Sequence, residues 1–170
     1  GSADLNGDGD YDDAGESSGY GNIDIFISKF STDGTFQWAK RLGGPSNDYG
    51  GSIACDNSGN VYVTGYVYGS ADLNGNGNST DSTVESTGYG YDDIFISKFS
   101  TDGTFQWAKR LGGPNHDYGY SIACDDSGNV YVIGHVNGAA DLNGDSDSTD
   151  GIVESTGYGD LDIFIVKFKN

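Results

Sequence analysis

Short runs of apolar residues, bounded by Gly, Asn, Asp and Ser, follow one another along the chain. Residues 93–99 (DIFISKF) lead through a Ser-Thr-Asp-Gly turn into residues 104–111 (TFQWAKRL), and residues 52–56 (SIACD) lead through Asn-Ser-Gly into residues 60–67 (NVYVTGYV). β-Branched and aromatic side chains favour strands, whereas Gly and Asp favour the tight turns between them. Because no stretch has the caps and the 3.6-residue apolar period of a helix, the pattern predicts an all-β chain.

The strand at residues 93–99 has apolar side chains on both faces. Ile94 and Ile96 lie on one face, and Phe95 and Phe99 on the other. A strand of this kind is expected in a small sheet that packs between two neighbouring sheets.

The strand pattern repeats at a fixed interval. Residues 24–45 (DIFISKFSTDGTFQWAKRLGGP) return letter for letter as residues 93–114, and a partial third copy begins at Gly138. A fixed period means that each repeat is one supersecondary unit that stacks on its neighbours to bury a core. A four-stranded antiparallel meander repeated radially is a β-propeller, so we expect each repeat to supply one blade.

The repeat boundaries predict about two blades that do not close within one chain. Residues 1–45 supply an inserted loop and the outer two strands of a blade, and residues 46–114 a complete blade with an inserted loop at 69–91. Residues 115–170 supply the inner strands of the next blade, with an inserted loop at 138–161. Closed propellers have about four to eight blades.

Two explanations account for this count. In one, the chain is a piece of a larger repeat protein. In the other, copies associate head to tail, and the terminal strands of one molecule complete a blade of its neighbour. Contacts that do not close in this way give filaments.

A family resemblance rests on residues 111–136, LGGPNHDYGYSIACDDSGNVYVIGHV. This run resembles the bacterial SBBP beta-propeller repeats, which have a YG-x-x-IA-x-D-x-x-GNVYV-x-G core after a WA-x-x-LGG strand. The resemblance covers nearly all of the chain except the insertions, which such shorter repeats normally lack. It implies a secreted or surface protein of bacteria or archaea with no shared catalytic activity, and it carries over no site residues.

The charge narrows the range of partners. The chain of 170 residues has 26 acidic and 8 basic side chains, a net charge of −18. It should therefore repel nucleic acid and anionic membrane surfaces and attract divalent cations. No apolar run approaches the length of a membrane span, so we expect no membrane insertion.

The two cysteines, Cys55 and Cys124, hold the same position in successive repeats. Equivalent positions in adjacent units usually lie too far apart for a disulfide. We therefore expect free thiols in the core.

Each insertion opens with a candidate Ca²⁺ loop. In the first, Asp4, Asn6, Asp8 and Asp12 fit the spacing D-x-N-x-D-G-x-x-D, which resembles the calcium loops of integrin-type FG-GAP repeats and, more loosely, of EF-hands. Ca²⁺ takes six to eight oxygen ligands, and alternate residues of a tightly turning loop direct their oxygens toward one centre. The further acids of this loop are Asp10 and Asp13.

The other two insertions keep parts of this pattern. The candidate ligands are Asp72, Asn74, Asn76 and Asp81 in the second loop, and Asp141, Asn143, Asp145, Asp147 and Asp150 in the third. Glu85 and Glu154 lie too far along for the bidentate ligand of an EF-hand unless the loop is irregular. The alternative for all three loops is a solvated acidic turn stiffened by Asx hydrogen bonds.

The sequence gives little support for catalysis. His116 and His135 replace Asn47 and Tyr66 of the preceding repeat, and the chain has no HExxH, GxSxG or phosphate-loop motif.

Taken together, the repeats, the candidate Ca²⁺ loops and the family resemblance lead us to expect a non-catalytic, extracellular, calcium-stabilised structural or adhesive protein that associates with identical chains. The alternative is a carbohydrate-binding module that uses the rim where the insertions and the blade-joining loops meet. An enzyme is the third possibility.

Overall fold

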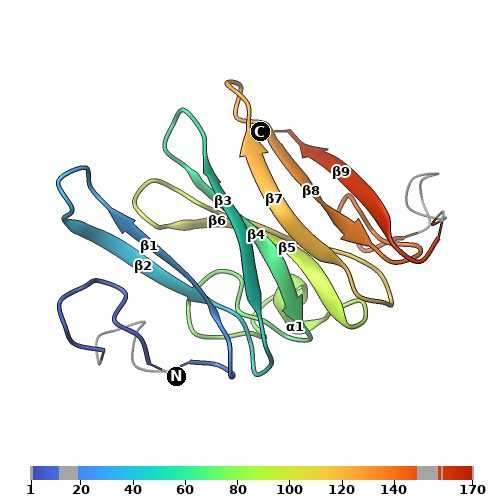
Figure 1. The fold of residues 1–170 in the computed structure, drawn as a ribbon, viewed down its shortest axis with the longest axis horizontal. Helices are drawn as coiled ribbons and strands as arrows, with labels where there is room; N and C mark the ends of the chain where they lie inside the picture. Colours follow the sequence, from blue (N-terminus) through green and yellow to red (C-terminus); the bar gives the residue numbers. More distant parts are fainter. Residues whose placement is uncertain (1, 12–18, 149–156, 158, 170) are drawn as a thin grey trace.

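The computed structural model describes residues 2–11, 19–148, 157 and 159–169, and these form three antiparallel sheets (Figure 1). The first sheet has two strands, the second four and the third three, each in sequence order. The strands are β1 (Ile25–Phe30), β2 (Phe36–Leu42), β3 (Tyr49–Cys55), β4 (Val61–Tyr68), β5 (Asp92–Phe99), β6 (Phe105–Leu111), β7 (Tyr118–Cys124), β8 (Val130–Val136) and β9 (Asp162–Phe168).

The predicted all-β, blade-like architecture is confirmed. The three sheets lie side by side in sequence order, and the described part of the chain forms no closed barrel (Figure 1). The second sheet, β3-β4-β5-β6, is a complete four-stranded meander. The tight β5–β6 turn depends on Gly103, whose φ of 83° suits glycine and whose N–H donates to the carbonyl of Ser100.

The middle sheet is packed on both faces, as the alternation in β5 predicts. Ile94 and Ile96 lie in a core with residues of the third sheet, among them Ile122. Phe95 and Phe99 lie in a second core with residues of the first sheet. In each repeat, therefore, the isoleucines of this strand face the following blade and the phenylalanines face the preceding one.

Identical residues at the same repeat position differ in exposure, depending on whether the described structure has a blade on the side that they face. Phe95 is fully buried, whereas Phe26, its counterpart in β1, is 62% exposed. Ile94 is also fully buried, whereas its counterpart Ile163 in β9 is 72% exposed. Each exposed residue points to the side on which the described structure has no neighbouring blade.

Two local expectations need correction. The second insertion contains a one-turn helix, α1 (Thr83–Ser86), which the sequence did not signal because four residues cannot show a helical period. The cysteines are free as expected, but Cys55 is exposed and Cys124 only half-buried. Both thiols end an innermost strand, where packing by other strands is incomplete.

Candidate functional site

The insertions lie against the blade-joining segments, as predicted from the meander. Asp72, in the second insertion, pairs with Gly43 at the end of β2. Asp141, in the third, exchanges two backbone hydrogen bonds of 2.7 and 2.9 Å with Gly112 at the end of β6. The second and third insertions therefore each tie their own blade to the outermost strand of the preceding one.

The second loop is organised around the carboxylate of Asp72, which is fully buried. Its Oδ1 accepts hydrogen bonds from the N–H groups of Asn74 and Gly75 at 3.0 and 2.6 Å. Its Oδ2 accepts from the N–H of Gly77 at 2.7 Å and from the hydroxyl of Tyr20 at 2.6 Å. Because Tyr20 belongs to the preceding repeat, this carboxylate also connects two repeats.

Backbone N–H groups also donate to the first aspartate of the other two loops, although Asp4 is exposed and only Asp141 is buried as Asp72 is. Asp4 accepts from the N–H groups of Gly7 and Gly9. Asp141 accepts from two backbone N–H groups on its Oδ1, from the N–H of Ser146 on its Oδ2 at 2.6 Å, and from the hydroxyl of Tyr89 at 2.7 Å. Ser146 replaces the loop glycine yet keeps its left-handed conformation, with a φ of 79°. Burial and the hydrogen bond to Asp141 raise the pKa of Tyr89 to about 12.

Glu85 belongs to the second loop, although it lies outside the EF-hand spacing. Its side chain is buried, and its Oε1 accepts from the N–H groups of Leu73 and Asn74 at 2.9 and 3.1 Å. The amides of Asn74 and Asn76 both donate to Asp81, at 3.5 and 2.6 Å. The structure thus brings Asn74, Asn76, Asp81 and Glu85 into one loop.

Other candidate ligands are less closely associated or lie outside the described residues. In the first loop, backbone N–H groups donate to Asn6 and Asp8, and the N–H that reaches Asp8 belongs to Asp10. In the third loop, Asp147 donates its N–H to Asp145 at 2.9 Å. Within the described ranges no three His, Cys, Asp or Glu side chains form a metal-binding group. Asp12, Asp13, Asp150 and Glu154 lie outside the described residues.

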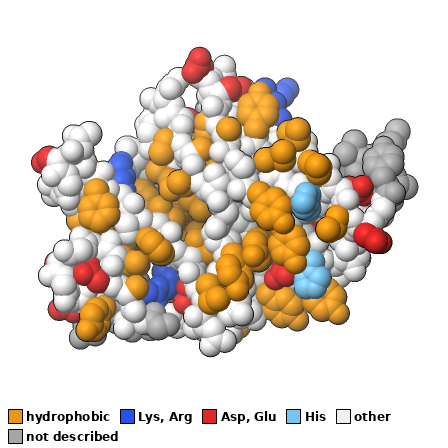
Figure 2. Space-filling view, viewed as in Figure 1, with side chains coloured by type: hydrophobic (Ala, Val, Ile, Leu, Met, Phe, Trp, Pro, Cys, Tyr) orange, Lys and Arg blue, Asp and Glu red, His pale blue; other side chains and the backbone are white. Residues whose placement is uncertain are grey.

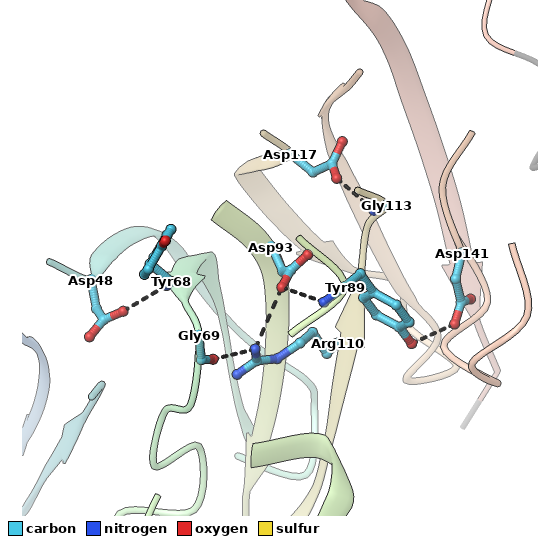
Figure 3. Close-up of polar contacts among 9 residues, drawn as sticks. All are labelled: Asp48, Tyr68, Gly69, Tyr89, Asp93, Arg110, Gly113, Asp117 and Asp141. Carbon is cyan, nitrogen blue, oxygen red and sulfur yellow. Dashed lines mark hydrogen bonds and ion pairs between the residues drawn. The ribbon is translucent and has the colours of Figure 1, made fainter. Parts of the chain in front are cut away.

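A row of buried carboxylates runs through the blade junctions (Figure 3). Asp48 accepts from the N–H groups of Gly44 and Tyr68, at 2.6 and 3.1 Å. Asp117 does the same one repeat later, since it accepts from Gly113 at 2.7 Å and from Asn137 at 2.8 Å. Each carboxylate fixes the blade-joining loop to the end of the second strand.

Between these two carboxylates lies a buried ion pair. Arg110 Nη1 lies 3.5 Å from Asp93 Oδ2 and donates to the carbonyl of Gly69 at 2.5 Å, while the N–H of Tyr89 donates to Asp93 at 3.0 Å (Figure 3). Arg110 Nε and Nη2 and Asp93 Oδ1 are buried without a hydrogen-bond partner. The pair is therefore incompletely compensated, and removal of either partner would leave a buried charge.

The sequence pattern does not reveal the role of these junction residues. The available signal was the unchanged Asp two residues before Gly in both copies of the D-Y-G segment, at Asp48 and Asp117. Invariance between two near-identical repeats cannot separate such a residue from its many unchanged neighbours. Only the burial of the carboxylate reveals its role.

The buried Asp93 should make stability pH-dependent. Burial raises its pKa from 3.8 to about 7, an effect that Arg110 only partly offsets. The folded state therefore holds this proton over a range in which the unfolded state has lost it, and the free energy of unfolding should fall as the pH rises from about 4 to about 7. Urea unfolding across this range should show a flatter profile for Asp93→Asn, which cannot ionise.

Asp24→Asn is the matched control, because Asp24 holds the same repeat position but is only half-buried. We expect it to retain the pH slope of the unchanged protein. An equally steep slope in Asp93→Asn would contradict the assignment of the slope to this carboxylate.

Comparison with known proteins agrees with the fold. The model of a family described as SBBP, a beta-propeller repeat, matches residues 37–74 and 106–143. Each matched segment runs from the outermost strand of one blade, through the junction, into the insertion of the next. In the described residues, no helix is long and apolar enough to cross a membrane.

Two curated proteins match this chain at moderate sequence identity. The chain is 31% identical over 137 residues to the uncharacterized WD repeat-containing protein L264 of Acanthamoeba polyphaga mimivirus. This match covers 75% of this chain and 10% of that protein. The chain is also 31% identical over 114 residues to the regulatory protein FlaEY of Caulobacter vibrioides. This match covers 67% of this chain and 12% of that protein. The chain thus spans about a tenth of the length of these relatives. In its two blade-and-junction segments, residues 37–74 and 106–143, the chain matches the SBBP beta-propeller repeat family.

Proposed function

We propose that this chain is a non-catalytic structural protein of the cell exterior, whose blades associate head to tail with blades of other copies. The observation that carries the proposal is the exposure of Phe26 and Ile163, which correspond to residues buried between blades inside the chain. At the internal junctions, the corresponding side chains Phe95 and Ile94 are covered by a neighbouring blade, which supports a surface of the same kind as the partner. A second copy of the chain presents both of the matching faces.

The two end faces are apolar and have different compositions. The trailing face is formed by Ile163 and Ile165 of β9, each 72% exposed. The leading face contains Phe26 of β1 and Ile53 of β3, and Ile53 is 55% exposed whereas its counterpart Ile122 is buried. Because the faces differ, their contact is heterologous and propagates into a filament unless rotation closes it.

A groove beside β1 also suits an added strand. A cavity of about 360 Å³ is lined by Ile27, Phe30 and Trp38 on one side and by Ile53 and Val61 on the other. Among the described strands, β1 pairs only with β2, whereas β5 pairs with both β4 and β6. In the other two sheets the third strand of the blade pairs with the second, as β5 does with β4 and β9 with β8. An added strand at the edge of β1 would therefore take the position of β4 or β8.

The repeat order specifies how strands can be shared. β9 and β1 both hold the third position of a blade, so joining the described sheets β7-β8-β9 and β1-β2 edge to edge would give five strands instead of four. Stacking of the apolar faces therefore has stronger support than completion of one blade from two chains.

Calcium in the insertion loops would strengthen the blade junctions, because the same loops pair with the preceding blade. The support is the convergence of Asn74, Asn76, Asp81 and Glu85 and the turn geometry shared by the three loops. Extracellular calcium modules bind at about 10⁻⁴ to 10⁻³ M, which suits exposed loops of this kind and a location outside the cell. Bound Ca²⁺ would also offset part of the net charge of −18.

Tyr120 opposes close packing of a further blade against β7 at the trailing end. A Cβ at Gly51 would lie 2.4 Å from the carbonyl oxygen of Gly119 in the following blade. Tyr120 holds the same position in β7 and does carry a Cβ. A further blade therefore cannot approach β7 as closely as β7 approaches β3.

Sedimentation velocity over a range of protein concentrations tests the proposal. We expect oligomers that grow with concentration in millimolar Ca²⁺ and shrink with chelator. Ile163→Asp combined with Ile165→Asp should abolish association without unfolding the chain, because both side chains are exposed. Tyr120→Gly, which restores the residue of the preceding repeat, should strengthen association.

Tyr11→Asn provides a control for surface substitution, because Tyr11 is 56% exposed and belongs to the first insertion and not to the strands that carry the two end faces. A monomer at all concentrations, with and without Ca²⁺ and also after Tyr120→Gly, would rule out head-to-tail association.

A further inference from the structure

The second junction contains residues that the first does not. Residues 24–45 and 93–114 are identical, so the differences that flank them stand out. Asn22 and Ile23 become Tyr91 and Asp92, and Asn47 becomes His116. Farther along, Gly51 becomes Tyr120, and Tyr66 becomes His135.

The fold brings these substituted positions together. The rings of Tyr91 and His116 are stacked with centroids 4.7 Å apart, and His116 Nδ1 lies 2.7 Å from a carboxylate oxygen of Asp92. The rings of Tyr120 and His135 meet edge to face at 5.2 Å. Residues that lie far apart in the sequence therefore contribute to one surface.

An unchanged tyrosine, Tyr118, links the two pairs. Its ring is stacked with that of His116 at 6.2 Å and with that of Tyr120 at 6.2 Å, with interplanar angles of 11° and 14°. Tyr91, His116, Tyr118 and Tyr120 thus form a row of nearly parallel rings. We call this row, together with Asp92 and His135, the Tyr–His surface.

The Tyr–His surface is open to solvent. Figure 2 shows both histidines of the chain within a band of hydrophobic side chains on this face. Tyr91 is 51% exposed and Tyr120 48%, and half of the His116 side chain is exposed. Clusters of exposed aromatic rings are typical of interaction sites, whereas scattered apolar residues are normal on any surface.

The fold itself does not require these rings. At the first junction the same backbone carries Asn22, Asn47 and Gly51, and the strand registers of β3–β4 and β7–β8 are equivalent. The chain thus contains its own comparison for Tyr91, Asp92 and His116, whereas the first junction keeps the stacked pair Tyr49 and Tyr66, and Gly51 is required there by the close approach of β7. The presence of Tyr91 and His116 at the second junction points to a ligand and not to folding.

Charge and hydrogen bonding limit the class of ligand. The net charge of −18 and the carboxylate of Asp92 disfavour phosphate, nucleic acid and acidic sugars. Asp92 already pairs with His116, so its carboxylate attracts a cationic ligand less strongly than an unpaired carboxylate would. Tyrosine hydroxyls and imidazole nitrogens supply both donors and acceptors beside electron-rich ring faces.

We propose that the Tyr–His surface binds a neutral oligosaccharide. Sugar rings lie against the exposed faces and edges of Tyr91 and Tyr120, and sugar hydroxyl groups exchange hydrogen bonds with Asp92 and His116. The succession of rings suits several linked sugars better than a single one. Binding here requires no association between copies of the chain, so it does not rest on the function proposed above, although Tyr120 also lies where a further blade would approach β7.

Isothermal titration calorimetry with neutral hexasaccharides tests the proposal. The probes are β-1,4-linked glucose, xylose, mannose and N-acetylglucosamine and α-1,4-linked glucose, with a heparin hexasaccharide and tetramethylammonium as charged comparisons. We expect saturable binding of at least one neutral probe, and a loss of affinity of about tenfold or more in the double variant Tyr91→Asn, His116→Asn.

This variant copies the residues of the first junction, Asn22 and Asn47, so the chain should still fold; its thermal unfolding and its sedimentation are checked in the same buffers. Tyr11→Asn should bind as the unchanged protein does. The proposal is overturned if no neutral probe binds at about 1 mM, if the double variant binds equally well, or if tetramethylammonium binds more tightly. Unchanged sedimentation in the double variant separates this result from a failure of head-to-tail association.

Discussion

Phe95→Ala is expected to lower the free energy of unfolding by about 3 to 5 kcal/mol, the usual cost of deleting a fully buried phenylalanine side chain. Phe95 is fully buried in the core between the first and second sheets, where Ile27, Leu42 and Val63 also lie. The surrounding strands are held by hydrogen-bonded ladders and cannot collapse into the cavity. Urea unfolding followed by tryptophan fluorescence measures the effect.

Phe26→Ala is the matched control, because it makes the same change in the same seven-letter strand sequence. Phe26 is 62% exposed, so its replacement in the monomer should cost less than about 1 kcal/mol. The comparison should be made at a concentration at which the protein is monomeric. Equal losses in the two variants would show that Phe26 is buried in solution and that the leading face is covered.

Asp117→Ala has the second largest expected effect, a loss of about 2 to 5 kcal/mol. The carboxylate accepts hydrogen bonds from the N–H groups of Gly113 and Asn137, and each buried donor left without a partner costs about 1 to 3 kcal/mol. The predicted result is a lower midpoint of urea unfolding, with the blade-joining loop released from the end of β8.

Asp117→Asn removes the charge and retains only one of the two hydrogen bonds, because Oδ1 accepts from Asn137 and Oδ2 from Gly113. The amide keeps one acceptor oxygen in nearly the same shape, so this variant should lose less stability than Asp117→Ala. Asp48→Ala should repeat the alanine result at the preceding junction, where Asp48 accepts from Gly44 and Tyr68. A small effect of both alanine variants would mean that water replaces the carboxylates.

Much of the fold could be predicted because strand patterns are local. The alternation in DIFISKF identified β5 and showed that both of its faces are buried. The fixed period identified the blades and the places of the insertions. The one-turn helix at Thr83–Ser86 was missed because its stability comes from the surrounding loop, including the buried Glu85.

The candidate sites were predicted less completely. The D-x-N spacing located loops that are indeed built alike, each around its first aspartate. Spacing alone could not show that Glu85 returns to the second loop, because that return depends on the path of the whole insertion. The aromatic residues of the Tyr–His surface looked like ordinary differences between repeats until the fold placed them in contact.

The sequence by itself determined the strands, their period and the blade that each repeat builds, because turn chemistry and alternation act over a few residues. The tertiary structure decided which of two identical side chains is buried. Phe26 and Phe95 share their local sequence and their pairing with the following strand, yet within the described structure only Phe95 has a neighbouring sheet on its side. Burial depends on what lies across the interface, and no local pattern contains that information.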